Sequence, residues 1–463
     1  MDRRELLRKL MLGIPAGVFL PSLLSSCKDD LVPGDINFSG KVLIIGAGAA
    51  GIYAAALLEE YGIDYQIVEA SNRTGGRINS NLTFSDVPIE LGAEEIHGQR
   101  SILYDLANHF ATSRLGKDDL TDYFLFNNQL RTESYLRESA ELAGEGETLY
   151  QLIDSLGTYP GTNQTLTQYL TDFPVDSRLM QIANALVGNE YGADNDLIGM
   201  VALREAESLY SSGSTNFKFK SGTYWKLFED AFPAVFNKVI LNEQIISIDY
   251  SGSTVMASSA AGGSYTADKV LVTVPLSILK GGDINFTPAL PALKISSIED
   301  IEMGNVLKVI LKFNSRFWAE DTSSIIGAER VPEYWVTHAG KESSDFLLTA
   351  FVAGTKAESL LQLEESQLIS ALINELSSLY PIGAVSGRFT GQYVIKDWSQ
   401  EPFIRGAYSY PSINSLGKRT SLSDPVSDRL YFAGEACNYN GHIGTVHGAM
   451  ESSYITIAQI LKS

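Results

Sequence analysis

A short segment near the N-terminus, residues 41–69, constrains the fold of this 463-residue chain more than any other. Residues 41–45 (KVLII) and 65–68 (YQIV) are short, mainly apolar runs, which are typical of strands buried on both faces. Between them lie a glycine-rich turn, residues 46–51 (GAGAAG), and a stretch of helical composition, residues 52–60. The second run ends at Glu69. This order of strand, turn, helix, strand and acid predicts a dinucleotide-binding βαβ unit of the Rossmann type.

Each small residue of that turn has a distinct predicted role. Gly46 allows the tight turn, Gly48 lets the backbone approach a pyrophosphate, and Gly51 lets the helix pack closely on the strand. Ala50 lies at the start of the helix, whose free N–H groups attract phosphate. Glu69 is placed to bind a ribose hydroxyl.

The next residues, 69–77 (EASNRTGGR), separate flavin from nicotinamide as the predicted ligand. The double glycine permits close backbone approach, and Arg73 and Arg77 can meet phosphate charge. At this turn the chain resembles the flavin amine oxidases, a family that includes monoamine, polyamine and L-amino-acid oxidases. The resemblance implies that the turn, with Ala70 and Gly76, lies along FAD, and that Arg77 lies near the pyrophosphate and the isoalloxazine.

The resemblance continues at residues 90–98 (ELGAEEIHG), which are similar to the family's segment beside the flavin ring. It implies that His97 faces the substrate channel, as in polyamine oxidases of the animal type. Glu95 replaces the bulky aromatic residue that commonly precedes the Ile-His-Gly ending. An acidic pair here favours a cationic substrate. The alternative is that Glu94 and Glu95 are solvated or paired with Arg100.

Lys308 is the predicted catalytic residue. It lies in the apolar run 306–311 (VLKVIL), where strand alternation could point it inward, although a lysine at a sheet edge could also reach water. The family resemblance at residues 303–309 favours the inward position, because the family's lysine holds a water against flavin N5.

The C-terminal segments complete the resemblance. Tyr408 matches the substrate-facing tyrosine, and Ala407 stands where covalently flavinylated monoamine oxidases have a cysteine, which implies that FAD is bound non-covalently. Residues 430–435 (LYFAGE) match the family's last FAD strand, and residues 444–449 (GTVHGA) open the final helix, whose N-terminus can stabilise negative charge on the flavin. The remaining residues to which the resemblance assigns FAD contacts are Gly92, Ala93, Ile245, Gly434, Glu435, Thr445 and Val446.

The expected fold is therefore α/β, with a Rossmann-type FAD-binding domain, made of a parallel sheet and a β-meander, interleaved with an α+β substrate domain. We expect a signal peptide at residues 1–26, a tether at 27–39, FAD-binding parts at 40–98, 221–284 and 401–463, a mainly helical substrate segment at 99–220, and a second substrate segment at 285–400. The meander is expected to end in the run 270–275.

The first residues are predicted to be a targeting signal rather than part of the folded structure. Arg3 and Arg4 precede an apolar run over 10–24 that is too short to span a membrane, which indicates a secretory signal of the twin-arginine type. Residues 24–27 (LSSC) resemble the bacterial lipobox, so Cys27 is the predicted lipid-attachment site. The protein is then exported and lipid-anchored in the bacterial cell envelope, on the periplasmic or surface face. The other cysteine, Cys437, is expected to be a lone buried thiol.

Composition excludes several other classes of protein. The formal net charge of −20 argues against nucleic acid as a partner. His442 and His447 are five residues apart, and no carboxylate or cysteine completes a ligand spacing with them, so the sequence predicts no metal site. No nucleophile elbow of the serine hydrolases occurs. The oligomeric state is left open.

The resemblance implies an FAD-dependent oxidase that transfers a hydride from a small cationic amine to flavin N5 and passes the electrons to oxygen. The products are an imine or aldehyde and hydrogen peroxide. The alternatives are an L-amino-acid oxidase, which needs a clamp for the substrate carboxylate and for which Arg405 is the nearest candidate, a flavin desaturase, and a non-enzymatic surface-binding lipoprotein.

Overall fold

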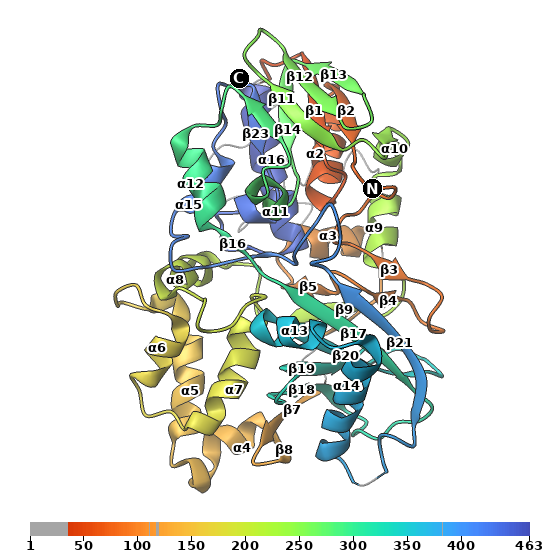
Figure 1. Cartoon of the computed structure of the whole chain (residues 1–463), viewed down its shortest axis with the longest axis vertical. Coiled ribbons are helices and arrows are strands. Elements are labelled where there is room, and N and C mark those ends of the chain that lie inside the picture. The colour runs from red at the N-terminus through yellow and green to blue at the C-terminus, as the bar shows by residue number, and fades with distance from the viewer. Residues whose placement is uncertain (1–35, 111, 117–119, 382) are drawn as a thin grey trace.

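A parallel sheet and a mixed seven-stranded sheet organise the fold (Figure 1). The computed structural model describes residues 36–110, 112–116, 120–381 and 383–463, so the predicted signal peptide and Cys27 lie outside the described residues. Both sheets carry helices, which confirms the predicted mixed α/β class.

The parallel sheet has the strand order β10-β2-β1-β14-β23 and contains the predicted βαβ unit. Along β1, Val42 and Ile44 pack in a core with the helices α2 and α16, whereas Leu43 and Ile45 pack on the opposite side with residues of the meander. Both faces are buried, as the apolar runs predicted. The elements are β1 (Lys41–Ile45), α2 (Ala49–Glu60), β2 (Asp64–Val68), β10 (Val239–Ile240), β14 (Lys269–Val272), β23 (Leu430–Phe432) and α16 (Val446–Lys462).

The meander differs from the prediction at its end. It consists of β11 (Ile245–Asp249), β12 (Val255–Ser259) and β13 (Ser264–Ala267), to which β15 (Asn285–Thr287) adds in parallel beside β11. The run expected to close it becomes β14, which lies between β1 and β23 in the parallel sheet. An apolar run suits burial on both faces, which the parallel sheet provides and the outer strands of the meander do not. Because β15 pairs with β11, this sheet extends to residue 287, past residue 284, where the second FAD-binding part was expected to end.

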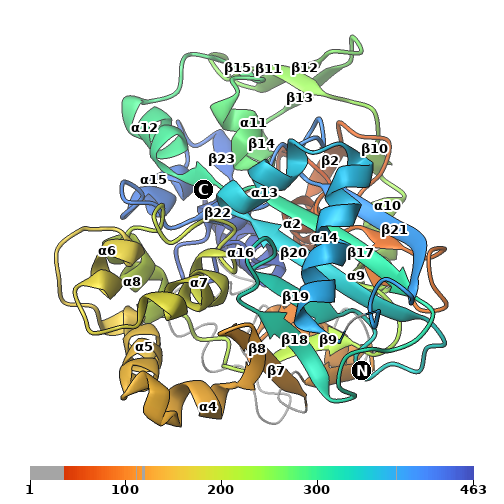
Figure 2. The same ribbon diagram turned by 60° about the horizontal axis from the view of Figure 1, so that its bottom comes forward.

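The seven-stranded sheet has the order β21-β17-β20-β19-β18-β7-β8. In β17, Leu307, Val309 and Leu311 face α13 and α14, which cover one side of the sheet (Figure 2). The even-numbered residues of β17, including Lys308, therefore face the parallel sheet and its loops. The elements are β7 (Thr121–Phe126), β8 (Gln129–Thr132), β17 (Val306–Phe313), β18 (Thr322–Ile326), β19 (Glu333–Val336), β20 (Phe346–Ala353), α13 (Gly354–Leu361), α14 (Glu365–Leu379) and β21 (Phe389–Asp397).

The segment expected to be helical, 99–220, also contributes strands and a helix to other parts of the fold. Its helices α4 (Glu133–Glu138), α5 (Glu145–Asp154), α6 (Leu166–Thr171), α7 (Met180–Ala183) and α8 (Met200–Leu209) share one core. However, β7 and β8 belong to the seven-stranded sheet, and α3 (Ile102–His109) packs in the core of α2 and α16. A separate small sheet joins β5 (Glu95–His97), β9 (Asn216–Phe219) and β6 (Arg114–Gly116). Local periodicity did not reveal these long-range pairings.

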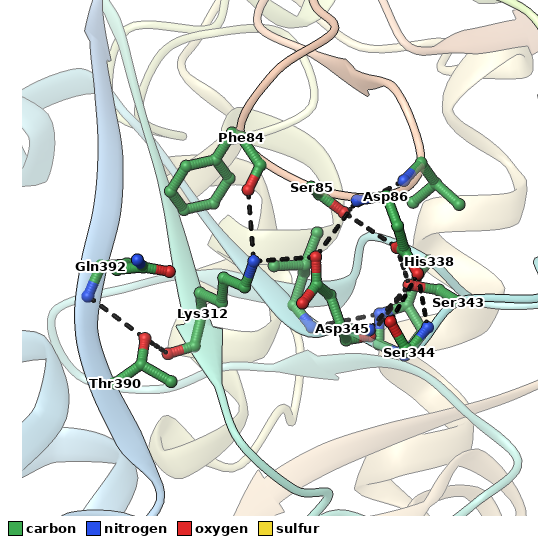
Figure 3. A network of polar contacts seen from close by, with 12 residues as sticks. Phe84, Ser85, Asp86, Lys312, His338, Ser343, Ser344, Asp345, Thr390 and Gln392 are labelled. Carbon is green, nitrogen blue, oxygen red and sulfur yellow. Dashed lines mark hydrogen bonds and ion pairs between the residues drawn. The ribbon is translucent and has the colours of Figure 1, made fainter.

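A network of polar contacts holds the loop after β3 (Ser80–Asn81) against the seven-stranded sheet (Figure 3). Lys312, on β17, donates to the carbonyl oxygen of Phe84 at 3.3 Å and to the carboxylate of Asp345 at 2.8 Å. Asp86 accepts hydrogen bonds from the backbone and hydroxyl of Ser344. The loop that leads to residues 90–98 is thereby attached to the strand that carries Lys308.

Short elements complete the frame: β4 (Ile89–Glu90), α9 (Tyr224–Ala231), α10 (Pro233–Phe236), α11 (Leu276–Lys280), α12 (Ala292–Asp300), β16 (Glu302–Met303), β22 (Ser409–Tyr410) and α15 (Lys418–Ser423). Among the described residues, no helix is long and apolar enough to cross a membrane. Cys437 is buried as predicted, and burial raises the pKa of its thiol to about 12.

Candidate active site

A cavity of about 1240 Å³ lies between the carboxyl ends of the parallel strands and the inner face of the seven-stranded sheet. Every residue predicted to bind cofactor or substrate, or to act in catalysis, lines it except Gly51, which lies behind the turn. Cavities at the carboxyl edge of a parallel sheet are the usual ligand sites of such folds. The structure thus brings together residues that are separated by up to 400 positions in the sequence.

The nucleotide end of the cavity is built by the glycine turn. A Cβ on Gly51 would lie 1.9 Å from the carbonyl oxygen of Gly46, so only glycine lets α2 pack this closely. A Cβ on Gly48 would meet nothing within 4 Å, so the chain is open to a ligand there. No side chain caps the N-terminus of α2, whose N–H groups are available to an anion.

Glu69 holds the turn from the adjacent strand. Its carboxylate accepts hydrogen bonds from the backbone N–H of Ala47 at 2.7 Å and of Ser71 at 2.9 Å. A carboxylate has about four acceptor positions, so capacity remains for ribose hydroxyls. The geometry fits the predicted ribose contact.

The two arginines of the second turn differ in their roles. The guanidinium of Arg73 donates to the carbonyl oxygens of Thr74, Gly76 and Ile78, and so supports the turn itself. These bonds involve Nη1 and Nη2, the atoms with which it would bind a phosphate bidentately. Arg77 instead reaches across the cavity and donates to the carbonyl oxygen of Ala407 at 2.7 Å and to Glu435 at 2.8 Å.

Glu435 is a buried anion held by that contact. Burial acts to raise its pKa, but the charges of Arg77 and Arg419 outweigh burial and leave the pKa below its ordinary value. The hydroxyl of Ser409 also donates to Glu435 at 2.6 Å. Because its charge is neutralised by the arginines, Glu435 orders the junction of three chain segments rather than adding net charge to the cavity.

The N-terminus of α16 forms a further wall. Thr445 is its N-cap: the hydroxyl accepts from the N–H of Gly448 at 2.9 Å and donates to the carbonyl oxygen of His442 at 2.8 Å. Thr445 and Val446 line the cavity, so the positive end of the helix dipole is directed at it. This end can stabilise negative charge on a bound group.

Lys308 lies at the centre of a buried ion cluster. It is 2% exposed, and its ammonium donates to the carbonyl oxygens of Glu90 at 2.8 Å and Gly92 at 3.1 Å and to the carboxylate of Glu94 at 2.7 Å. Three acceptors match the three N–H groups of an ammonium. The prediction that alternation points Lys308 inward is confirmed.

Glu94 bridges two lysines. Its second oxygen accepts from Lys218 on β9 at 3.1 Å. Burial would raise the pKa of Glu94, but Lys218 and Lys308 more than compensate and lower the pKa to about 2. Glu94 is thus bonded to two lysines, and Lys218 also lies 3.8 Å from Glu95, which accepts a hydrogen bond from the side chain of Asn216 at 3.1 Å.

The register of the seven-stranded sheet places a row of side chains along the cavity wall. Lys308 on β17 lies opposite Phe351 on β20, which lies opposite Glu333 on β19. Trp335, two residues beyond Glu333, shares its face, and the ammonium of Lys308 lies 5.0 Å from the ring centre of Trp335. Tyr408 closes this chamber from the other side, and its hydroxyl donates to the carbonyl oxygen of Glu190 at 2.9 Å.

The chamber is acidic because of residues that the sequence analysis did not single out. Glu190, Glu207 and Glu333 line the cavity together with Glu95. Glu190 follows the π-helical segment Asn184–Gly188, a type of distortion that is frequent at functional sites. The spacing of Glu333 and Trp335 in an apolar strand was a usable sequence signal, because both point to one face.

Arg405, the candidate clamp for a substrate carboxylate, is engaged elsewhere. Its guanidinium pairs with Asp283, and Arg405 is absent from the cavity lining. The guanidinium groups that line the cavity in the described part of the chain are those of Arg73 and Arg77, and both are bonded to protein oxygens.

One correction concerns the histidines. Glu451 lies beside His442 and His447, and the three offer ligand atoms within 4.8 Å of one another. The prediction that no carboxylate completes a ligand set with these two histidines is therefore wrong, because Glu451 lies beside them in the folded structure. Glu451 is four residues after His447 on α16, so the two share a helix face, and this spacing was visible in the sequence.

The glycine turn, the acid predicted to bind ribose and two helix N-termini around one cavity are typical of a dinucleotide-binding redox fold, and the open backbone at Gly48 leaves room for a cofactor. The family model of flavin-containing amine oxidoreductases matches residues 49–229 and 235–461. The chain belongs to this family, and its cofactor is FAD.

Individual relatives are more distant. The chain is 24% identical to polyamine oxidase 4 of Oryza sativa subsp. japonica over 94% of this chain and 90% of that protein. It is 26% identical to human lysine-specific histone demethylase 2 over 94% of this chain, but spans only 55% of the length of that protein. The structure of wild-type putrescine oxidase bound to putrescine superposes with a TM-score of 0.79 at 19% identity, covering 92% of this chain and all of that one, which shows a shared fold.

Proposed function

We propose that this chain oxidises a small cationic primary or secondary amine, of monoamine or polyamine type, to an imine that hydrolyses to an aldehyde, with oxygen reduced to hydrogen peroxide. FAD, when bound, supplies the hydride acceptor at its N5 atom. The observation that carries the proposal is the acidic and aromatic chamber formed by Glu95, Glu190, Glu207 and Glu333 with Tyr408 and Trp335.

The chamber suits an ammonium group for physical reasons. Carboxylates in a partly desolvated cavity attract a cation more strongly than they do in water, and aromatic faces add cation–π attraction. Tyr408 and His97 border the chamber and can orient the amine. An amino acid would bring a carboxylate to the same place, where no unengaged guanidinium lines the wall in the described residues.

Lys308 is proposed to keep a fixed positive charge beside the reacting centre. Its three N–H groups are all bonded, so the ammonium is held in position and its charge favours the reduction of oxygen to an anionic species. A water held by this ammonium must share one of these protons.

Anaerobic titration of the purified flavoprotein tests the substrate class. We expect putrescine or spermidine to bleach the flavin absorbance and L-amino acids to leave it unchanged. Bleaching by amino acids alone would show instead that the protein is an L-amino-acid oxidase. If no amine or amino acid reduces the flavin, the remaining alternatives are a flavin desaturase and a non-enzymatic binding protein.

A matched pair of variants tests the chamber. Glu333→Gln keeps an acceptor for the hydroxyl of Ser324, which donates at 2.7 Å, but removes the charge. Loss of one such attraction of about 1 kcal/mol raises KM for a diamine roughly 5-fold. Glu302→Gln, on the surface, should leave KM unchanged; equal effects would contradict the proposal.

Lys308→Met tests the role of the lysine. We expect reoxidation of the reduced flavin by oxygen to slow by about 10-fold or more, because a positioned charge is lost. Lys312→Met is the control, since Lys312 lies on the same face of β17 but binds Phe84 and Asp345 outside the cavity. Unchanged reoxidation in Lys308→Met would refute the assignment.

We also propose export through the twin-arginine route and lipid attachment at Cys27, on the strength of Arg3, Arg4 and residues 24–27. Radiolabelled palmitate should be incorporated into the wild-type protein and not into Cys27→Ser. Replacing both arginines by lysine should leave the protein in the cytoplasm. Labelling of Cys27→Ser would contradict the proposed anchor.

A further inference from the structure

A segment that bridges two walls of the cavity, residues 398–406, has no part in the function proposed above. We call this segment the strap. It lies between β21 and β22 in the sequence, and its residues 398 and 401–404 line the cavity. Pro402 is exposed and also lines the cavity, so the cavity reaches the solvent beside the strap. The contacts at the two ends of the strap determine how firmly it covers this opening.

The first end of the strap is buried. Trp398 is 3% exposed, and its indole N–H donates to the carbonyl oxygen of Leu91 at 3.0 Å. A Cβ on Gly92 would lie 2.9 Å from the ring of Trp398 and 1.8 Å from the carbonyl oxygen of Arg77, so these residues are tightly packed. This end is therefore joined to the two segments that the family resemblance places along FAD.

The other end of the strap is attached at the surface. The hydroxyl of Ser277, on α11, donates to the carbonyl oxygen of Ile404. The guanidinium of Arg405 pairs with the carboxylate of Asp283, which follows α11 and lines the cavity. The side chains of Arg405 and Asp283 are 38% and 22% exposed, so water and salt reach this ion pair. Of the two ends, this one can open with the smaller loss of buried contacts.

The backbone at Arg405 is strained. The N–H groups of Ile404 and Arg405 donate to the carbonyl oxygen of Glu401 at 3.0 and 2.9 Å, which forms a single helical turn. Arg405 ends this turn with a φ of 48°, in the left-handed region. Glycine is the usual residue at such a position because it has no Cβ, and a residue with a side chain is strained there. The arginine therefore owes its place to its side chain, which forms the ion pair, and not to its backbone conformation.

We propose that Arg405 retains FAD in the cavity. Its ion pair with Asp283 attaches the exposed end of the strap to the wall that follows β14, so release of FAD through the opening at Pro402 requires this pair to break. Arg405 is a positioning residue, because it does not line the cavity and acts through the strap. The proposal concerns the FAD cofactor of the family and does not depend on the proposed amine oxidation.

The rate of FAD release from the purified holoprotein tests this role. Dilution into phosphodiesterase cleaves each released FAD to the more fluorescent FMN, so the fluorescence reports release and rebinding is prevented. We expect Arg405→Met to release FAD about 3- to 5-fold faster than the wild type, within the range for one partly exposed ion pair. Arg405→Lys keeps the positive charge and should release FAD at nearly the wild-type rate. Lys418→Met is the control, because it removes a similarly exposed ion pair, with Asp300, outside the cavity.

Two further measurements distinguish the ion pair from a general loosening of the fold. Asp283→Asn should release FAD as fast as Arg405→Met, and the double variant should be no faster than either single variant, because all three lack the same interaction. The difference between the wild type and these variants should shrink at 1 M NaCl, where the Debye length is about 3 Å and the pair is screened.

The outcomes decide the proposal without reference to any amine. Equal rates for Arg405→Met and the wild type would overturn it, as would additive effects of the two single variants or equal acceleration by Lys418→Met. A difference that persists at 1 M NaCl would overturn it too, because the residue would then act through packing. If Arg405→Met does not fold, Asp283→Asn makes the same test from the other side of the pair. A flavin that no amine reduces contradicts the proposed function and leaves the role of Arg405 intact.

Discussion

Replacing Glu94 by glutamine should destabilise the protein strongly, because Glu94 is the carboxylate between two buried lysines. Its pKa of about 2, against the ordinary 4.5, is a difference of 2.5 units, which corresponds to about 3 kcal/mol of stability at neutral pH. Breaking a buried ion pair by removing one partner typically costs 3–5 kcal/mol, which is consistent. We expect the free energy of unfolding of Glu94→Gln to be about 3 kcal/mol lower.

The pH dependence gives this prediction its sign. The folded-state pKa of Glu94 is lowered, so its contribution is complete above pH 4.5 and is lost as the pH falls toward 2. Urea denaturation of the flavin-loaded protein, followed by tryptophan fluorescence, should show a constant difference between variant and wild type from pH 5 to 8. The difference should shrink at pH 4.

A surface pair provides the control. Glu302 lies 2.8 Å from Lys280, almost the same distance as Glu94 from Lys308, but 45% of its side chain is exposed. Glu302→Gln should therefore cost at most about 1 kcal/mol. If Glu94→Gln loses no more than Glu302→Gln, burial does not strengthen the cluster and the reasoning about Lys308 is wrong.

Three further predictions follow from single side chains. Burial raises the pKa of Glu90 to about 7, so the folded protein loses stability as the pH rises from 4.5 through 7. Glu90→Gln should therefore be more stable than the wild type by up to about 3 kcal/mol at pH 8 and by little at pH 4. Equal gains in stability at both pH values, measured by urea denaturation, would contradict this. Gly51→Ala should lose most bound FAD, measured as flavin absorbance per protein, because its Cβ would lie 1.9 Å from the oxygen of Gly46, whereas Gly252→Ala, with 3.5 Å of room, should retain it. Since Ala407 offers no thiol, acid precipitation should release FAD into the supernatant, and flavin left in the pellet would disprove non-covalent binding.

The nucleotide end of the site was predictable because its signals are local. Both strands, at residues 41–45 and 64–68, begin within one residue of the positions that the apolar runs predicted. The helix between them begins three residues earlier than predicted. Burial on both faces, a tight turn and a free helix N-terminus each leave a mark in a short window of sequence.

The substrate end was harder, because its partners are remote in the chain. Lys218 meets Glu94 across 124 residues, and no local pattern announces an ion pair of that separation. Glu190 and Glu333 come from a π-helical turn and a strand that converge only after the sheet has formed. The strand β14 was misplaced for the same reason, since an apolar run does not specify its neighbours.

The two lysines of β17 carry a mechanical consequence. Lys308 and Lys312 are four residues apart on one face of the strand, roughly 13 Å along it, and both grip the stretch from Phe84 to Glu94. Because the strand is attached to this stretch at two points, the sheet cannot pivot about either of them. The cavity wall that carries Lys308 should therefore stay fixed, and we expect any widening that admits substrate to come from the helical side, around Glu190, where neither lysine attaches the chain.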